Sequence, residues 1–419
     1  MINPKTQERE LCYVARITKI TPIEGADNIE LITINDGWVC IAKIGEFKVD
    51  DLCVYFEIDS KLPEAEWSEF LASKHYKVKT MKLGKFKVIS QGLALPVSAF
   101  GWELGTSGQF AEDVPIIITK DKNFPYFAEG DFLTSYLGVT YSVAEDNKRK
   151  APSVDKYKKM AQRHPKVFQK SFVRWLYKRN WGKKLLFVFF GKKKDTRNWP
   201  QWVVKTDEER VENMPWVLQD KNIKWFATEK IDGTSTTFTL KRAKNIFTNS
   251  EYYVCSRNVV FDTPEKAERC YYDSNVYLEM AEKYNMRQVL GKMLALDDSL
   301  SFVTIQGETY GESIQKRTYG LKGRDLAVFN VIFGYNTGEV VRLNPHKMKS
   351  IMDEYEIPTV PILNESYILP DTIEELRVYV DKETSKIDGK MKEGIVFRSS
   401  DGKKSFKCVS PTYLIKYHS

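Results

Sequence analysis

In the second half of the chain, polar residues recur at the ends of short apolar runs. The first is Lys230, which follows the apolar stretch 223–227 and precedes Asp232 and Gly233. Singly, such residues are more often turn or ion-pair residues than members of an active site. The later polar and aromatic positions come in a fixed order: Arg257, Glu308, Phe329, Glu393 and Lys407. As an ordered series they indicate one site built from several strand ends.

The region from Trp199 to the end alternates β-rich and helical patterns, which predicts an α+β domain. Runs rich in β-branched and aromatic residues predict strands within 224–231, 234–242, 252–257, 302–311, 326–335, 393–400 and 404–410. Helical spacing of apolar residues predicts helices within 262–286 and 344–357.

The first part of the chain shows a different pattern, in which short β-rich runs are separated by polar turns. These runs cover residues 12–20, 29–34, 38–44 and 52–58, with a further strand and turn expected within 88–100. Strands of this length and spacing predict a small β-barrel or sandwich that extends to about residue 141.

Between these regions lies a basic, aromatic-rich segment. Residues 148–197 contain eighteen Lys/Arg and two Asp, a local net charge of +16, so the remainder of the chain carries −8 of the total +8. Helical spacing would place Phe168, Phe172 and Trp175 or Leu176 on one face. Three interpretations stay open: a solvated linker with an apolar stripe, a nucleic-acid surface, or a peripheral membrane anchor.

The composition excludes several other classes of protein. The six cysteines form no C-x-x-C pair and the four histidines are scattered, which argues against a disulfide framework, a zinc site and a His-based triad. We therefore expect reduced core thiols. The first seventeen residues lack an apolar run typical of a signal peptide, and the longest apolar run near the basic segment is too short to span a bilayer. We expect a cytoplasmic protein, and a viral or phage source is compatible with this.

The ordered series resembles the motifs of the covalent nucleotidyltransferases, which are the ATP-dependent RNA and DNA ligases and the mRNA capping enzymes. The resemblance spans about residues 201–416. Segment 203–215, ahead of Lys230, is similar to the same region of ATP-dependent RNA ligases that carry an N-terminal OB domain. Residues 23–63 and 89–96 are similar to that OB domain.

This resemblance implies an α+β fold in which an N-terminal OB-like β-barrel precedes an antiparallel-sheet, ATP-grasp-like nucleotidyltransferase domain. The implied domains are 1–141 (OB-like, RNA-binding), 142–198 (basic insert or linker) and 199–419 (nucleotidyltransferase). It implies an ATP-dependent RNA ligase that joins 3′-OH and 5′-phosphate ends through a lysyl-AMP on Lys230. A lysine amine with a pKa of about 10 is a poor nucleophile, so we expect nearby cations and partial burial to lower that pKa.

The resemblance also implies a role for each of the other site residues. Asp232 and Glu393 would hold Mg²⁺ or Mn²⁺. Among the residues implied to bind ATP, the Glu229 backbone would help read adenine, Phe329 would stack on adenine and Glu308 would contact the ribose. Arg257 would hold the ribose or the RNA end phosphate. Lys407 would contact the α-phosphate, and Arg210 and Lys205 would contact phosphates. Phe329 is equally well explained as a core residue. A strand-to-strand ion pair is the structural alternative for Arg257 and Glu308.

Two positions depart from the family pattern. Ser405 stands two residues before Lys407, where these ligases often have a second lysine, and Lys416 is a candidate replacement. Asn330 follows Phe329 at a position where an acid could serve a metal ion.

The expected partner is RNA with 3′-OH and 5′-phosphate ends, most simply a nicked duplex, bound by a monomer. The alternatives are a DNA ligase, a capping guanylyltransferase and a catalytically inactive RNA-binding module. The OB-like domain precedes the catalytic domain, whereas capping enzymes and most DNA ligases carry theirs after it. A complete set of Lys230, Asp232, Glu308 and Glu393 argues against inactivity.

Overall fold

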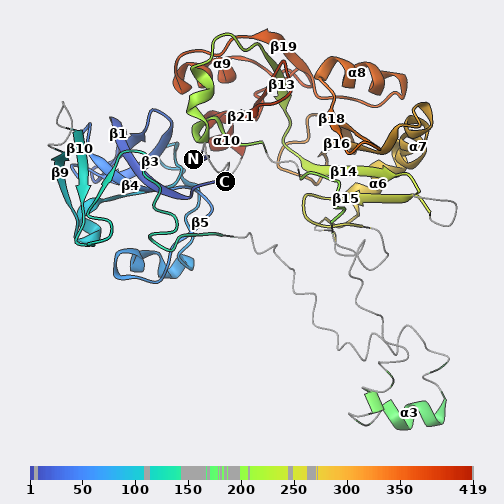
Figure 1. The fold of residues 1–419 in the computed structure, drawn as a ribbon, viewed down its shortest axis with the longest axis horizontal. Helices are drawn as coiled ribbons and strands as arrows, with labels where there is room; N and C mark the ends of the chain where they lie inside the picture. Colours follow the sequence, from blue (N-terminus) through green and yellow to red (C-terminus); the bar gives the residue numbers. More distant parts are fainter. Residues whose placement is uncertain are drawn as a thin grey trace. The chain divides into compact units, whose positions relative to one another are not determined.

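The computed structural model describes residues 1–3, 8–107, 114–142, 167, 170–177, 179, 182–183, 186, 199–205, 208–243, 249–261, 270 and 272–417. Residues 1–142 and 202–419 together make one compact unit, and residues 143–201 make a second (Figure 1). None of the helices in the described ranges has the length and hydropathy of a membrane span.

The N-terminal domain is built on a five-stranded antiparallel sheet with the order β3-β2-β1-β4-β8. Its strands are β1 (Cys12–Pro22), β2 (Ile29–Ile34), β3 (Trp38–Lys43), β4 (Leu52–Phe56) and β8 (Leu93–Pro96). β1 is buried on both faces, because its alternate side chains enter two separate apolar clusters. The strands predicted at 12–20, 29–34, 38–44 and 52–58 are thereby confirmed.

Smaller elements surround this sheet. Two 3₁₀ helices cover Glu66–Lys74 and Val97–Phe100. The remaining strands are β5 (Ser60–Lys61) with β12 (Thr140–Tyr141), the hairpin of β6 (Met81–Leu83) and β7 (Val88–Ser90), and the sheet of β9 (Glu103–Ser107), β10 (Val114–Ile118) and β11 (Tyr126–Ala128).

The C-terminal domain contains two antiparallel sheets. One has the order β19-β13-β20-β21 and the other the order β15-β14-β16-β17-β18. Their strands are β13 (Trp225–Lys230), β14 (Thr234–Lys241), β15 (Glu251–Cys255), β16 (Leu300–Gly311), β17 (Arg324–Tyr335), β18 (Val340–Arg342), β19 (Ile362–Tyr367), β20 (Gly394–Ser399) and β21 (Ser405–Val409). The α+β prediction, with a β-barrel ahead of an antiparallel-sheet domain, is confirmed.

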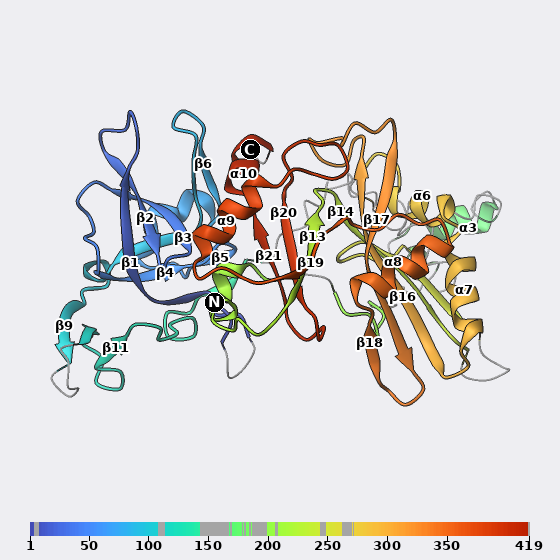
Figure 2. The ribbon, with the colours of Figure 1, turned by 90° about the horizontal axis from the view of Figure 1, so that it is seen from above.

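The helices of this domain are α6 (Val276–Lys283), α7 (Met286–Leu296), α8 (Pro345–Glu354), α9 (Ile373–Lys382) and α10 (Pro411–Tyr417). Two 3₁₀ turns, Val211–Asn213 and Pro215–Leu218, precede β13. The Thr372 side chain and Glu375 form a capping box that starts α9. Figure 2 shows α9 alongside β20 and β21, the strands that it contacts.

Helix prediction was only partly correct in this domain. The helix at 344–357 is confirmed as α8, but within 262–286 the described residues are helical only in α6 and at Met286. Asn275 starts α6, because its side chain accepts a hydrogen bond from the amide of Leu278. Residues 262–269 and 271 lie outside the described residues.

In the basic segment the structure describes one helix, α3 (Ser171–Tyr177). The rings of Phe172 and Trp175 lie 5.9 Å apart on it, as the predicted shared face requires. Phe168 lies outside the described residues, as do most of the segment's basic positions.

All six cysteines are free thiols. Five of them are buried and Cys270 is half-buried, in keeping with the expected reduced thiols.

The segment 208–213 connects the two domains of the large unit. The Asn213 carbonyl accepts a hydrogen bond from the amide of Ile2 (3.0 Å). Arg377 of α9 donates to both the Gly37 carbonyl and the Glu212 carboxylate, each at 2.6 Å. These contacts tie the β2–β3 turn of the N-terminal domain to the C-terminal domain.

Candidate active site

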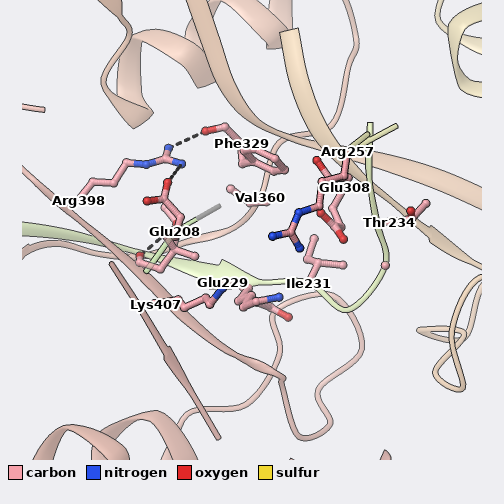
Figure 3. Close-up of a pocket in the computed structure, with 15 residues that line it drawn as sticks. Glu208, Glu229, Ile231, Thr234, Arg257, Glu308, Phe329, Val360, Arg398 and Lys407 are labelled. Carbon is pink, nitrogen blue, oxygen red and sulfur yellow. Dashed lines mark hydrogen bonds and ion pairs between the residues drawn. The ribbon is translucent and has the colours of Figure 1, made fainter. Parts of the chain in front are cut away.

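A cavity of about 300 Å³ is lined by residues from both sheets of the C-terminal domain. Strand ends and adjoining turns supply most of its polar side chains, as the sequence series predicted. The residues singled out in the sequence that line it are Glu229, Lys230, Gly233, Arg257, Glu308, Phe329 and Lys407. Asp232, Glu393 and Lys205 do not line it. Figure 3 shows several of these side chains pointing into the same space.

Lys230 is positioned by the pairing of β13 with β20. The side chains of Trp225, Ala227 and Glu229 in β13 are buried in the domain. Lys230 is the last residue of this strand and is only partly buried. The antiparallel register places Lys230 opposite Gly394, next to Glu393. The Lys230 Nζ lies 2.6 Å from Oε2 of Glu393, and the lysine side chain is 24% exposed. The predicted nucleophile and one predicted metal ligand are therefore direct partners.

The pKa of the Lys230 amine is raised, whereas the sequence led us to expect a lowered pKa. Burial lowers the pKa of its amine, but the carboxylates of Glu393, Glu308 and Asp232 outweigh this and hold the pKa above its ordinary value. The raised pKa favours the protonated form of the amine.

Asp232 does not line the cavity and is only 5% exposed. Its amide donates to the Tyr319 hydroxyl (2.7 Å), and its Oδ2 accepts a hydrogen bond from the Tyr413 hydroxyl (2.9 Å). Tyr413 belongs to α10, so the C-terminal helix holds this carboxylate in place.

Gly233 permits a close approach of two strands. A Cβ at this position would lie 2.3 Å from the Thr309 carbonyl oxygen, far inside van der Waals contact. Only glycine allows the turn after Lys230 to pack against β16, which brings Glu308 to the cavity.

Glu308 and Arg257 lie on the wall opposite β13 (Figure 3). Burial raises the pKa of Glu308 to about 8, and the positive charge of Lys230 opposes that rise. Arg257 follows β15 and is exposed, and it also acts on Glu308 electrostatically. Lys205 contacts the same turn, because its Nζ donates to Oδ1 of Asn258 (3.1 Å).

Phe329 is both a core residue and a cavity residue, the two alternatives that the sequence left open. It packs against the main apolar core and also lines the cavity. Val396 of β20 lines the same cavity, so an aromatic and an aliphatic side chain are both available to a planar ring. Glu229, almost fully buried, accepts a hydrogen bond from the amide of Lys386 (2.8 Å).

The sequence analysis missed two charged residues of the cavity, Glu208 and Arg398. The Arg398 guanidinium donates to the Phe329 carbonyl (2.6 Å) and lies 3.3 Å from Oε1 of Glu208, as Figure 3 shows. Ser405 donates a hydrogen bond to the other oxygen of the same carboxylate. Burial raises the pKa of Glu208, but Arg398, Ser405 and Arg342 together hold it below its ordinary value.

The alternation of side chains along a strand could have identified Arg398 as a cavity residue. No comparable pattern in the sequence identifies Glu208. Arg398 is two residues from Val396 on a strand, so the two share a face with Gly394. Glu208 lies in an irregular segment before the 3₁₀ turn Val211–Asn213. No periodic pattern there indicates which way its side chain points.

Three other residues singled out in the sequence do not line the cavity. The Arg210 guanidinium lies 5.8 Å from the ring centre of Trp38 in the N-terminal domain, while its backbone pairs with that of Lys407. Lys416 is exposed on α10. Asn330 is buried and donates to Oε1 of Gln306 (3.0 Å), so it is part of an internal amide pair.

The charges of the site fit a divalent cation shared with a phosphate ligand. Glu393 and Asp232 are carboxylates near Lys230, and Glu308 carries a raised pKa in their field. Among the described residues there is no cluster of three or more His, Cys, Asp or Glu that could form a complete protein cage. Mg²⁺ usually binds through one or two carboxylates together with substrate phosphates, which agrees with this arrangement.

Two antiparallel sheets that present a lysine, acids and an aromatic residue to one cavity define the nucleotidyltransferase class expected from the sequence. Residues 223–418 match the RNA ligase family, and residues 11–97 match an OB-fold domain model. The C-terminal domain therefore matches the RNA ligase family, and the OB-fold match lies ahead of it in the chain.

Solved structures of the Naegleria gruberi RNA ligase are similar over the whole chain. A mutant with ATP and Mn has a TM-score of 0.62 and 26% identity, over 98% of this chain and 99% of that one. The same enzyme with PPi gives a TM-score of 0.61 and 26% identity at the same coverage. A mutant with AMP and Mn gives 0.62 and 26%, again over 98% and 99% of the two chains. No curated protein matches the chain.

Proposed function

We propose that the protein seals RNA ends with ATP, through a covalent adenylate on Lys230. The observation that carries the proposal is the Lys230 amine, which faces the cavity 2.6 Å from Glu393. The related Naegleria enzyme has been solved with ATP, AMP and PPi, the substrate and two products of such a reaction.

The first step is transfer of AMP to the enzyme. The neutral Lys230 amine attacks the α-phosphorus of ATP, a P–N bond forms with loss of one proton from the nitrogen, and pyrophosphate leaves with the electron pair of the broken P–O bond. In the second step an oxygen of an RNA 5′-phosphate attacks the same phosphorus. The P–N bond breaks, and the lysine nitrogen leaves with the electron pair and takes up a proton. In the third step an RNA 3′-hydroxyl attacks the 5′-phosphate, loses its proton and displaces AMP.

The purine lies between Phe329 and Val396, the aromatic and aliphatic surfaces of the cavity. Glu308 and Arg257 hold the ribose hydroxyls on the opposite wall, and the Glu229 backbone contacts the adenine edge. Lys407 contacts the α-phosphate and stabilises the charge that develops on it. Lys205, whose Nζ donates to Asn258, would contact a more distal phosphate.

Arg210 contributes in a different way from the phosphate contact expected for it. Its guanidinium lies against Trp38, and its backbone pairs with that of Lys407. It therefore supports the strand that carries Lys407 rather than touching the nucleotide.

A bound Mg²⁺ or Mn²⁺ would neutralise phosphate charge and the carboxylates around Lys230. Glu393 and Asp232 are the residues that would hold it, directly or through water. Removal of their charge from the field of Lys230 lets the pKa of the amine fall, which frees the nucleophile.

The proposed substrate is a nicked RNA duplex with 3′-OH and 5′-phosphate ends, bound by a monomer. The N-terminal domain contributes to RNA binding, as OB folds do through basic and aromatic surfaces. The basic segment 148–197 remains a second candidate RNA surface, and its Lys192, Lys193 and Lys194 lie outside the described residues.

The test is incubation of the protein with Mg²⁺ and α-labelled ATP or GTP, followed by addition of nicked substrates. Acid-labile protein label from ATP, chased into sealed RNA, is the expected result. Label from GTP alone would identify a capping enzyme. ATP label that is chased only into nicked DNA would identify a DNA ligase, and absence of label would leave an RNA-binding module.

A further inference from the structure

The hairpin of β6 and β7 carries an unusual concentration of positive charge. Residues 70–102 contain six lysines and no acidic residue. The lysines surround or belong to the hairpin: Lys74, Lys77, Lys79, Lys82, Lys85 and Lys87. Four of them are exposed and the other two are half-buried. Within the part of the chain that the structure describes, none of the six forms an ion pair with a carboxylate.

The tip of the hairpin combines these charges with an aromatic ring. The turn runs through Gly84, Lys85 and Phe86 to Lys87, which has a left-handed backbone (φ 54°). The Lys85 Nζ lies 5.1 Å from the ring centre of the half-buried Phe86. Lysines next to an accessible aromatic ring suit a nucleic-acid strand, which offers phosphates and flat bases together.

The hairpin also lies close to the catalytic residues. β7 packs against α10, and Figure 2 shows β6 beside that helix. The same helix carries Tyr413, whose hydroxyl donates a hydrogen bond to Asp232. The hairpin and the turn after Lys230 therefore both contact the short helix α10.

We propose that the β6–β7 hairpin is a phosphate-binding surface that seats one RNA strand next to the ligation site. The lysines neutralise consecutive backbone phosphates, and Phe86 offers a surface for an unpaired base. This inference rests on the proposed RNA-sealing function and identifies the element of the N-terminal domain that holds the substrate.

The test uses the full chain with Lys82→Gln, Lys85→Gln and Lys87→Gln combined. The matched control replaces three exposed lysines of the same domain outside the hairpin: Lys43→Gln, Lys48→Gln and Lys122→Gln. Binding of a fluorescent nicked RNA duplex is measured by anisotropy, without ATP, over a series of KCl concentrations. Thermal unfolding shows whether each variant folds. If the triple variant does not fold, the single variant Lys85→Gln is tested in its place.

The hairpin variant should bind RNA about tenfold more weakly or worse at low salt. Its plot of log K against log salt should be less steep by about 2–3, since each phosphate contact on a duplex contributes about 0.9. Equal losses in the hairpin variant and the control would show a general charge effect and overturn the proposal. Unchanged RNA binding, with loss of binding to phosphatidylserine vesicles instead, would make the hairpin a membrane contact.

Adenylylation by ATP without RNA separates this proposal from the function on which it rests. Both triple variants should be labelled like the unmodified protein, because step one needs no RNA. An unlabelled unmodified protein contradicts the proposed function. If the hairpin variant is labelled by ATP and binds RNA as tightly as the original protein, the hairpin proposal is wrong and the proposed function still stands.

Discussion

The hydroxyl of Ser405 donates a hydrogen bond to the carboxylate of Glu208, and the same carboxylate receives the guanidinium of Arg398. Related ligases often have a lysine at the position of Ser405. In this protein Glu208 is paired with Arg398 of β20 and, at 3.8 Å, with Arg342 of β18. The cavity therefore contains an acid held by two arginines and one serine hydroxyl.

Removal of the acid from this pair should destabilise the protein. Glu208→Ala leaves Arg398, whose side chain is 6% exposed, without its carboxylate partner. We expect a loss of about 3–5 kcal/mol in the free energy of unfolding, measured with urea, because a buried charge is left uncompensated. Asp353→Ala, which breaks an exposed pair with Lys349 on α8, should cost about 0.5 kcal/mol or less. Similar losses in both variants would contradict this role.

The hydroxyl of Tyr413 should matter for the metal requirement of the reaction. Tyr413→Phe removes the hydrogen bond that orients Asp232 and leaves the aromatic ring in place. The Mn²⁺ concentration for half-maximal adenylylation should rise by about tenfold, as is typical when the partner of a metal-binding carboxylate is lost. Tyr417→Phe, on the same helix, is the matched control. If the two variants have the same metal requirement, α10 does not position Asp232.

Gly233 should tolerate no side chain. Gly233→Ala would place a Cβ 2.3 Å from the Thr309 carbonyl, so β14 and β16 must separate. We expect a loss of at least about 1–3 kcal/mol in unfolding free energy and loss of adenylylation. Gly84→Ala has nothing within 4 Å of its new Cβ and should leave both measurements near their original values. Normal labelling by Gly233→Ala would show that this close approach is unnecessary.

Local patterns were enough to predict much of the fold. The strands of the N-terminal domain follow from their β-branched and aromatic runs, and α8 follows from Pro345 behind the Asn344 cap. The helix at 286–296 was not predicted beyond its first residue, because its apolar residues continue directly from the pattern that precedes it.

The candidate site depended on information that no single segment contains. The order of polar strand ends predicted several of the residues that line the cavity. It did not predict that Lys230 pairs with Glu393, which requires the β13–β20 register. Arg210 was expected at a phosphate and instead contacts Trp38, since only the docking of the two domains brings that ring near. The raised pKa of Lys230 likewise follows from carboxylates on three separate segments.

The central claim is that Lys230 carries the adenylate. The direct measurement is mass spectrometry of peptides after incubation with ATP and Mg²⁺, quenched at neutral pH to preserve the P–N bond. We predict one adenylyl group on the peptide that contains Lys230, lost in Lys230→Arg and retained in Lys224→Arg, an exposed lysine just ahead of the same strand. An adenylyl group on another residue, or its persistence in Lys230→Arg, would contradict the account.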